Sequence, residues 1–345
     1  MCRQCLVVLG YRGAMRRPLL RMTRKQTIVT VGMPVRNAMP WLPEAVESLL
    51  SQSARDFEIL AIVDGGTDDS LAYLKSVGDA RLRVVEQAHA GVTATLNRML
   101  REVRTPWLAR QDADDISYPA RLQKLLEAIG EHPEAGVIYS LADYHPREKC
   151  AGRFRCSRGT PGELRAIVEG GYLLSICHST VALNVDKALA AGGYRMDVHA
   201  EDADLWWRMV RRWEIHFIAE ALVGFRQSAG SVSSRNFEKQ ELAGIYVQYL
   251  LLSELWGWRP RALGEIAPAL GGLLRPTGLA AKEWLRRSNM QLAEGRRLRG
   301  AAALALALRA SPRYVLRRVW DEFGIAPVAN GVAPGLFLER KEALW

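Results

Sequence analysis

The sequence predicts an α/β fold in which a sheet is flanked by helices. From Thr27 onward, short β-rich runs alternate with stretches of helical periodicity, which is the rhythm of βαβ units. Loops rich in Asp and Gly follow the predicted strands, at the edge where open α/β sheets bind ligands. The chain has 345 residues and is 49% hydrophobic. It can therefore bury a core of ordinary size, which excludes a disordered or fibrous protein.

The predicted elements divide the chain into three parts. Strands are expected at residues 27–31, 58–63, 82–85, 107–110 and 136–139, and helices at 43–50, 91–103 and 203–212, after Asp68 and from Pro119. The section 143–200 is predicted to hold loops with short inserted elements. Beyond residue 230 the pattern turns helical. We expect a mobile basic arm at residues 1–25, an α/β domain at 26–235 and a helical basic extension at 236–345.

The net charge of +10 is concentrated near the two ends of the chain. Residues 1–25 carry seven Lys or Arg and no acid, and residues 259–318 carry thirteen Lys or Arg against three acids. Such ends suit nucleic acid, an anionic membrane or an acidic partner. The core is acidic and no nucleic-acid motif is visible, so we expect no nucleic-acid partner. A helix predicted from Pro312 has Val315 and Trp320 on one face and Arg313 and Arg317 on the other. Such a helix either lies on a membrane surface or packs on the domain.

Cysteine usage and hydropathy indicate the compartment. The five cysteines form an odd set, and a chain of this size needs no disulfide staples, so a reducing environment is expected. Cys2 and Cys5 have C-x-x-C spacing without a second pair to complete a zinc site. No stretch approaches the length of a membrane span or of a signal-peptide core. We expect a cytoplasmic protein that contacts the membrane peripherally if at all.

The strongest chemical signal is Asp112-Ala113-Asp114-Asp115, which follows an apolar strand. Three adjacent carboxylates repel one another unless a cation lies among them. In an extended segment Asp112 and Asp114 would share one side, where their oxygens suit Mg²⁺ or Mn²⁺. The alternative is an acidic turn that caps the helix expected from Pro119.

Further motifs in a fixed order resemble the family 2 glycosyltransferases over residues 27–235. The motifs are Gly32-Met-Pro-Val-Arg-Asn37, Val63-Asp-Gly-Gly-Thr-Asp-Asp-Ser70, the acidic motif itself, His178-Ser-Thr180, Gly192-Gly-Tyr-Arg195 and Glu201-Asp-Ala-Asp-Leu-Trp206. The resemblance implies a GT-A fold, a Rossmann-like mixed sheet flanked by helices. It implies an inverting, metal-dependent transferase that takes a UDP-, GDP- or dTDP-sugar and glycosylates a hydroxyl of a glycan or lipid-linked acceptor, in polysaccharide or glycolipid biosynthesis.

The resemblance also assigns a donor side. Pro34 and Asp64 would line the nucleotide pocket, with Asp64 accepting a hydrogen bond from the base, and Arg36 and Asn37 would lie nearby. Arg110 would lie near the phosphates, or alternatively pair with Asp114 or Asp115. Asp112 would contact the donor, and Asp112 and Asp114 would bind the metal. Asp68 and Asp69 are expected to cap the following helix.

On the acceptor side, the resemblance makes Asp202 the general base, with Glu201, His178 and Trp206 beside it. A single displacement would invert the anomeric configuration. The alternatives are that Glu201 and Asp202 are only N-terminal helix charges, that His178 is structural, and that Trp206 and Trp207 belong to the core, with at most one of them stacking on a sugar.

The sequence departs from the family pattern at two positions. Val63 stands where the family often has a second acid. Ser228 stands where relatives carry a His that completes the metal shell, so water, Gln227 or Ser228 would fill that position. Two other functions remain open, a nucleotidyltransferase and a basic nucleic-acid-binding protein. The first would carry a Gly-rich loop with a basic residue after the first strand, and residues 32–40 offer Arg36 alone.

Overall fold

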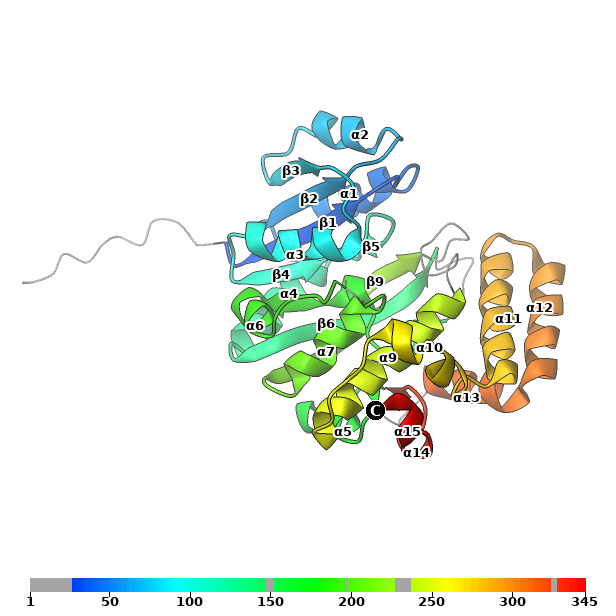
Figure 1. The fold of residues 1–345 in the computed structure, drawn as a ribbon. Helices are drawn as coiled ribbons and strands as arrows, with labels where there is room; N and C mark the ends of the chain where they lie inside the picture. The colour runs from blue at the N-terminus through cyan, green and yellow to red at the C-terminus, as the bar shows by residue number, and fades with distance from the viewer. Residues whose placement is uncertain (1–26, 147–151, 197, 227–236, 324–327) are drawn as a thin grey trace, which may run out of the picture.

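The computed structural model describes residues 27–146, 152–196, 198–226, 237–323 and 328–345. Figure 1 shows an α/β body with a helical hairpin at one side. The strands are β1 (Val29–Val35), β2 (Glu58–Asp64), β3 (Leu82–Gln87), β4 (Trp107–Arg110), β5 (Ile116–Ser117), β6 (Ala135–His145), β7 (Leu173–Leu174), β8 (Ala182–Asn184), β9 (Glu214–Arg226) and β10 (Ala329–Asn330).

The helices cover the sheet and then form the C-terminal part of the chain. They are α1 (Leu42–Leu50), α2 (Ser70–Ser76), α3 (Val92–Glu102), α4 (Arg121–Glu131), α5 (Pro161–Glu169), the 3₁₀ turn η1 (His178–Thr180), α6 (Val185–Ala190), α7 (Glu201–Val210), α9 (Phe237–Trp256), α10 (Leu263–Gly271), α11 (Pro276–Ala293), α12 (Arg297–Ala310), α13 (Pro312–Phe323), α14 (Gly335–Leu338) and α15 (Lys341–Leu344).

The main sheet is mixed, with the strand order β3-β2-β1-β4-β8-β6-β9-β5. Neighbours from β3 to β4 are parallel, with Gly32 of β1 opposite Arg110 of β4. β8 is antiparallel to both β4 and β6, and β9 is parallel to β6. The carboxyl ends of β1, β2, β4, β6 and β9 therefore meet at one edge. This edge gathers the loops that the sequence marks as functional.

The strands bury both faces, which explains their nearly continuous apolar runs. Within β2, Leu60 and Ile62 belong to one hydrophobic cluster with residues of α3 and α7. Ile59 and Ala61, which point to the opposite face, belong to a second cluster with residues of α1 and α4. Helices thus cover both faces of the sheet, as the predicted βαβ rhythm requires.

Most predicted elements are confirmed. The predicted strand at residues 107–110 coincides with β4, and the other expected strands and helices match elements that differ in their ends. The section 143–200 holds loops with short elements, as predicted, and among these elements are α5, α6 and β8, which is a central strand of the sheet. β8 has three residues, too few for a period to be read from the sequence.

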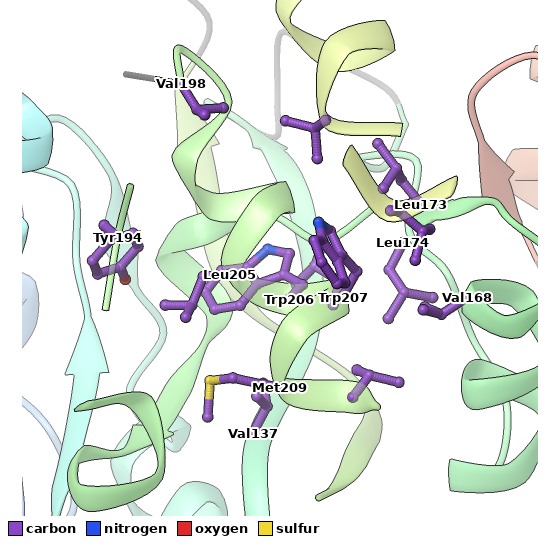
Figure 2. Packing of buried hydrophobic residues seen from close by; sticks show 14 of the residues in the cluster. Val137, Val168, Leu173, Leu174, Tyr194, Val198, Leu205, Trp206, Trp207 and Met209 are labelled. Atoms are coloured by element: carbon purple, nitrogen blue, oxygen red, sulfur yellow. The ribbon is translucent and has the colours of Figure 1, made fainter. Parts of the chain in front are cut away.

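The helical extension shares the core of the α/β domain. Tyr249 and Leu252 of α9 belong to the same buried cluster as Trp206 and Trp207 of α7, and Figure 2 shows the two indoles among Leu173 and other apolar side chains. In addition, β10 pairs with β7. The expectation that strands end before the extension is therefore wrong.

Some predictions concern residues that the structure does not describe. The basic arm with Cys2 and Cys5, and the loop with Gln227 and Ser228, lie outside the described residues. Cys156 and Cys177 are buried and form no disulfide. No helix in the described ranges combines the length and apolarity needed to cross a membrane.

Candidate functional site

Three loops after β1, β2 and β4 form the first part of the site. The side chain of Asn37 accepts a hydrogen bond from the N–H of Thr67 at 2.8 Å, and that of Asp68 accepts one from Met39 at 2.9 Å. Gly66 has a φ of 133°, and a Cβ there would lie 2.8 Å from Asn37 Oδ1. Asn37 and Asp68 thus join the β1 and β2 loops, while Arg36 is exposed at this edge.

The capping prediction for these loops is half confirmed. Asp68 accepts a hydrogen bond from the N–H of Ser70, the first residue of α2, at 3.1 Å. Asp69 occupies the N-cap position but makes no capping bond with its side chain. The prediction is therefore correct for Asp68 and wrong for Asp69.

Asp64, at the end of β2, is buried and held by the loop after β3. One oxygen accepts hydrogen bonds from Gln87 Nε2 (2.7 Å) and the N–H of Ala90 (2.8 Å). The other lies 2.8 Å from His89 Nδ1 and accepts from the N–H of Gly91 at 3.0 Å. Burial raises the pKa of Asp64, but these hydrogen bonds outweigh it and hold the pKa below its usual value. Asp64 is therefore ionised at the end of β2, and Pro34, near the end of the neighbouring strand β1, is partly exposed.

The acidic motif forms a tight turn. The N–H of Asp115 bonds to the C=O of Asp112 at 3.2 Å, so the predicted extended segment is wrong. Even so, Asp112 and Asp114 are partly exposed while Asp115 is fully buried. The alternative of a helix cap is also wrong, since α4 starts after Ala120 with no side-chain capping bond. The turn thus presents two carboxylates to solvent and buries the third.

The charges in the turn are unequal. Burial raises the pKa of Asp112, but the Arg110 guanidinium at 2.5 Å and the Ser179 hydroxyl at 2.9 Å hold it below its usual value. Burial and the neighbouring charge of Asp112 raise the pKa of Asp114 to about 6. The same two causes raise the pKa of Asp115 well above its usual value. Arg110 pairs with Asp112, so its predicted pairing with Asp114 or Asp115 is wrong.

Two arginines hold the turn in place. Arg121 is completely buried and donates to the C=O of Arg110 and of Ser179, both at 2.6 Å, and to the side chain of Gln111 at 2.7 Å. Arg226 donates its N–H to Asp115 Oδ1 at 2.8 Å and its Nε to the C=O of Asp114 at 2.9 Å. Neither was predicted as a site residue, because their partners come from distant segments.

Glu201 and Asp202 start α7 and lie partly exposed beside the acidic turn. Burial and the charge of Asp202 raise the pKa of Glu201 to about 7. Burial raises the pKa of Asp202, to which the charge of Asp112 also contributes, while Arg110 opposes both shifts. Oδ1 of Asp202 accepts the N–H of Ala203 at 2.7 Å. Arg110, which pairs with Asp112, is therefore close enough to act electrostatically on this carboxylate pair as well.

His178 and Trp206, the other acceptor-side candidates, pack against each other edge to face, with ring centroids 5.5 Å apart. His178 Nε2 lies 3.0 Å from the Tyr194 hydroxyl. Burial and Arg110 lower the pKa of His178 to about 3, so it is neutral. Trp206 and Trp207 are each 1% exposed (Figure 2). Neither ring can stack on a ligand in this conformation, so the expectation for Trp206 is wrong and the core alternative holds.

The Gly-Gly-Tyr-Arg motif is held by side chains that the sequence did not reveal. The amide of Asn97 bonds to both the N–H (2.9 Å) and the C=O (2.7 Å) of Tyr194. Arg208 pairs with buried Asp204 at 2.6 Å and donates to the C=O of Gly193 at 2.7 Å. These bonds fix Tyr194 and, through its hydroxyl, His178.

The acidic turn suits a hard divalent cation. Its donors are carboxylate oxygens, and burial together with the negative charge of Asp112 raises the pKa of Asp114. Asp115 Oδ2 is buried with no hydrogen-bond partner in the described part of the chain. Within those same residues, no group of three or more His, Cys, Asp or Glu is arranged to bind a metal. The turn would thus supply only part of a ligand set, an arrangement that Mg²⁺ tolerates when phosphates and water supply the rest.

Comparison with known proteins gives a family match. Residues 30–189 match the model described as glycosyl transferase family 2. The chain is 28% identical over 218 residues to Bacillus subtilis EpsE, a protein named as a glycosyltransferase, covering 61% of this chain and 76% of EpsE. It is 26% identical over 211 residues to the amylovoran biosynthesis glycosyltransferase AmsE of Erwinia amylovora, covering 58% and 77%. In four other relatives the match spans between 19% and 30% of their length.

Solved structures support the fold. S. aureus TarS 1–349 in complex with UDP-GlcNAc superposes with a TM-score of 0.52 at 14% identity, covering 81% of this chain and 90% of that one. The mannosyltransferase PcManGT of Pyrobaculum calidifontis, in complex with GDP-Man and Mn²⁺, superposes with a TM-score of 0.50 at 15% identity, covering 91% and 83%. With the curled mixed sheet, these similarities confirm the predicted GT-A fold.

Proposed function

Residues 30–189 place this chain in glycosyl transferase family 2, and we propose that it moves a sugar from a nucleotide-diphosphate sugar to an acceptor hydroxyl with inversion. One observation carries the proposal. The Asp112–Asp115 turn and the Glu201–Asp202 pair come from distant segments and act electrostatically on one another around Arg110. Family membership replaces the nucleotidyltransferase and nucleic-acid-binding interpretations.

The donor side comprises the loops after β1, β2 and β4. Asp64 faces the base, with Pro34, Arg36 and Asn37 around it, and Asp112 and Asp114 face the diphosphate. Bound Mg²⁺ or Mn²⁺ would neutralise the charge of the departing diphosphate. Arg110, which is 2% exposed, holds Asp112 ionised and oriented, and its positive charge would act on the phosphates without direct exposure to them. The complexes of TarS with UDP-GlcNAc and of PcManGT with GDP-Man and Mn²⁺ are consistent with such a donor.

On the acceptor side, we assign Asp202 as the general base. A carboxylate at a helix start is firmly placed, and the N–H of Ala203 fixes one oxygen while leaving the other available. Its raised pKa makes it a better proton acceptor than an exposed carboxylate. The attack of the acceptor oxygen on the anomeric carbon, opposite the diphosphate, would then invert the configuration. AmsE, named for amylovoran biosynthesis, supports a polysaccharide or glycolipid product.

Donor binding tests the first part of the proposal. Calorimetry with Mn²⁺ and UDP-, GDP- and dTDP-sugars should detect metal-dependent binding of one nucleotide class. Asp114→Ala should weaken that binding about tenfold or more, because one of the two exposed carboxylates is removed. The matched control is Asp69→Ala, an exposed carboxylate with no capping bond, which should bind as the wild type does. Unchanged affinity in Asp114→Ala would remove Asp114 from the donor site.

Turnover tests the assignment of Asp202. In Asp202→Asn the amide oxygen can keep the bond from Ala203, so the fold and donor affinity should persist. The loss of the base should lower turnover about a hundredfold or more. Asp186→Asn, another exposed acid in the first turn of a helix, should leave turnover unchanged. Equal turnover in Asp202→Asn and wild type would end the assignment.

A further inference from the structure

The outer faces of α12 and α13 combine exposed apolar side chains with arginines. Leu298 is 88% exposed, Leu316 65% and Trp320 72%. We define the arginine–leucine face by these exposed residues of the two helices: Arg297, Leu298, Arg299, Leu304, Leu306, Leu308, Arg309, Arg313, Leu316, Arg317, Val319 and Trp320. We propose that this face docks the protein on the surface of an anionic lipid bilayer.

The helices are held in the fold by their inner sides only. In α12, Gly300, Ala303 and Ala307 are buried, and their small size lets α11 pack closely. In α13, Val315 is buried. Asp321, later in the same helix, pairs with Arg155 at 2.7 Å. The two interpretations of the basic helix from the sequence are thus compatible, because one side packs on the domain and the other stays exposed.

The charge of this face selects its partner. Residues 295–320 contain seven Arg and no Asp or Glu. Of the exposed ones, Arg297, Arg299, Arg309, Arg313 and Arg317 form no ion pair with any residue that the structure describes. Arginines at both ends of an apolar stretch can contact lipid phosphates while the leucines enter the headgroup boundary. Trp320 suits the same boundary, where aromatic rings with a polar edge are enriched.

A second copy of the chain is a poorer occupant. A twofold interface brings the same patch of both subunits together, so the unpaired arginines of one copy would face those of the other. Such like-charge contacts oppose association. An anionic bilayer instead covers the apolar side chains and neutralises the arginines together.

Docking at this face would bring the site to the membrane. Arg318 of α13 lies 3.5 Å from the hydroxyl of Tyr144, next to the end of β6. His145, which ends β6, lies 3.2 Å from Glu44, and Glu44 pairs with Arg226, which holds the acidic turn. The face therefore borders the sheet edge that carries the site, where an acceptor anchored in the bilayer would be within reach.

Vesicle co-sedimentation of the full-length protein, without donor or metal, tests docking independently of transferase activity. We expect binding to phosphatidylcholine vesicles containing about one third phosphatidylglycerol, weakened by salt, and binding at least about tenfold weaker to phosphatidylcholine alone. No binding, or equal binding to both vesicles, would overturn the proposal even if the donor assays succeed.

Two pairs of substitutions locate the contact. Leu316→Ser with Trp320→Ser should weaken binding to anionic vesicles about tenfold or more. Val92→Ser with Leu338→Ser, which lie elsewhere and are 45% and 49% exposed, should not. Arg313→Gln with Arg317→Gln should weaken it about 30-fold, and Arg101→Gln with Arg104→Gln should not. Equal binding by all variants would contradict the proposal. A concentration-dependent dimer that the Leu316/Trp320 variant abolishes would assign the face to a second copy instead.

Discussion

At the scale of single residues, the site depends on carboxylates whose proton affinities differ. Asp64 and Asp112 are held ionised by hydrogen bonds and an arginine, whereas Glu201 and Asp202 are partly buried without a directly bonded cation. Environments that separate pKa values in this way allow one carboxylate to bind a ligand while another accepts a proton. The partly buried negative charge at the start of α7 lowers the stability of the folded state.

Glu201→Gln should therefore stabilise the protein at neutral and alkaline pH. Folding raises the pKa of Glu201 from 4.5 to about 7. The unfolded chain thus releases this proton first, and folded wild type loses stability as pH rises from 4.5 to about 7. The full shift corresponds to about 3 kcal/mol, which solvent at the partly exposed carboxylate reduces to about 2 kcal/mol. Urea unfolding should show this gain at pH 8 and none at pH 4.5. A constant difference at both pH values would exclude Glu201 as its source.

The sequence predicted the residues that carry charge but not those that hold them. Asp112 and Asp114 follow a predicted strand, and Asp202 stands in a motif that the family resemblance assigns to the acceptor side. Asn97 and Arg121 look like ordinary polar residues of helices, and their partners, Tyr194 and Ser179, are 97 and 58 residues away. No local pattern encodes such pairs, and a covarying position in relatives would be the signal that finds them.

At the scale of elements, the acidic turn is held between β4, α4 and η1. Arg121 in the first turn of α4 reaches across to the carbonyl of Arg110 in β4 and that of Ser179 in η1. Its planar fork meets several acceptors at once, and the nearby charge of Asp115 partly offsets its burial. Burial lowers its pKa to about 10, so the side chain stays charged at neutral pH.

Arg121→Lys should loosen the turn although it keeps the charge. A single ammonium cannot reach all the acceptors, so buried carbonyls lose partners and stability should fall by about 2–4 kcal/mol. The KM for the donor should rise because the turn is less well placed. Lys124→Gln, one turn later on the same helix and 38% exposed, should change stability by less than about 0.5 kcal/mol. Denaturant unfolding of both variants checks this prediction. If Arg121→Lys and Lys124→Gln changed the free energy of unfolding by the same amount, Arg121 would not stabilise the turn.

Long elements could be predicted from the sequence, and short ones could not. β1, β2 and α3 repeat their pattern over at least seven residues and were found with small errors at their ends. β8 and β5 have three and two residues, and only pairing with neighbouring strands makes them strands. For this reason the individual elements of the section 143–200 were not assigned from the sequence, since their regularity comes from tertiary contacts.

At the scale of the whole molecule, the helical extension and the α/β domain form one core. Gln248 of α9 bonds to the carbonyls of Gly171 in the domain and Val332 in the last segment, both at 2.8 Å. The main chain of β10 pairs with β7, and Arg155 donates to the carbonyl of Ala329 at 3.0 Å. The sequence predicted a separate helical extension and not a shared core. Helical periodicity predicts that a segment is a helix, but it does not show which surface the helix packs against.

A cavity in the extension should consequently destabilise the entire protein. Phe337 of α14 is 0% exposed and belongs to the cluster that contains Trp206 and Trp207. Phe337→Ala should cost about 3–4 kcal/mol, which for a chain of this length lowers the melting temperature by about 5 °C. Its neighbour Leu338 is 49% exposed, so Leu338→Ala should shift it by about 1 °C or less. Calorimetry should show a single transition that moves as a whole in Phe337→Ala. If the variant instead showed an early transition of the extension, with the main peak and donor binding unchanged, the two parts would be separate folding units.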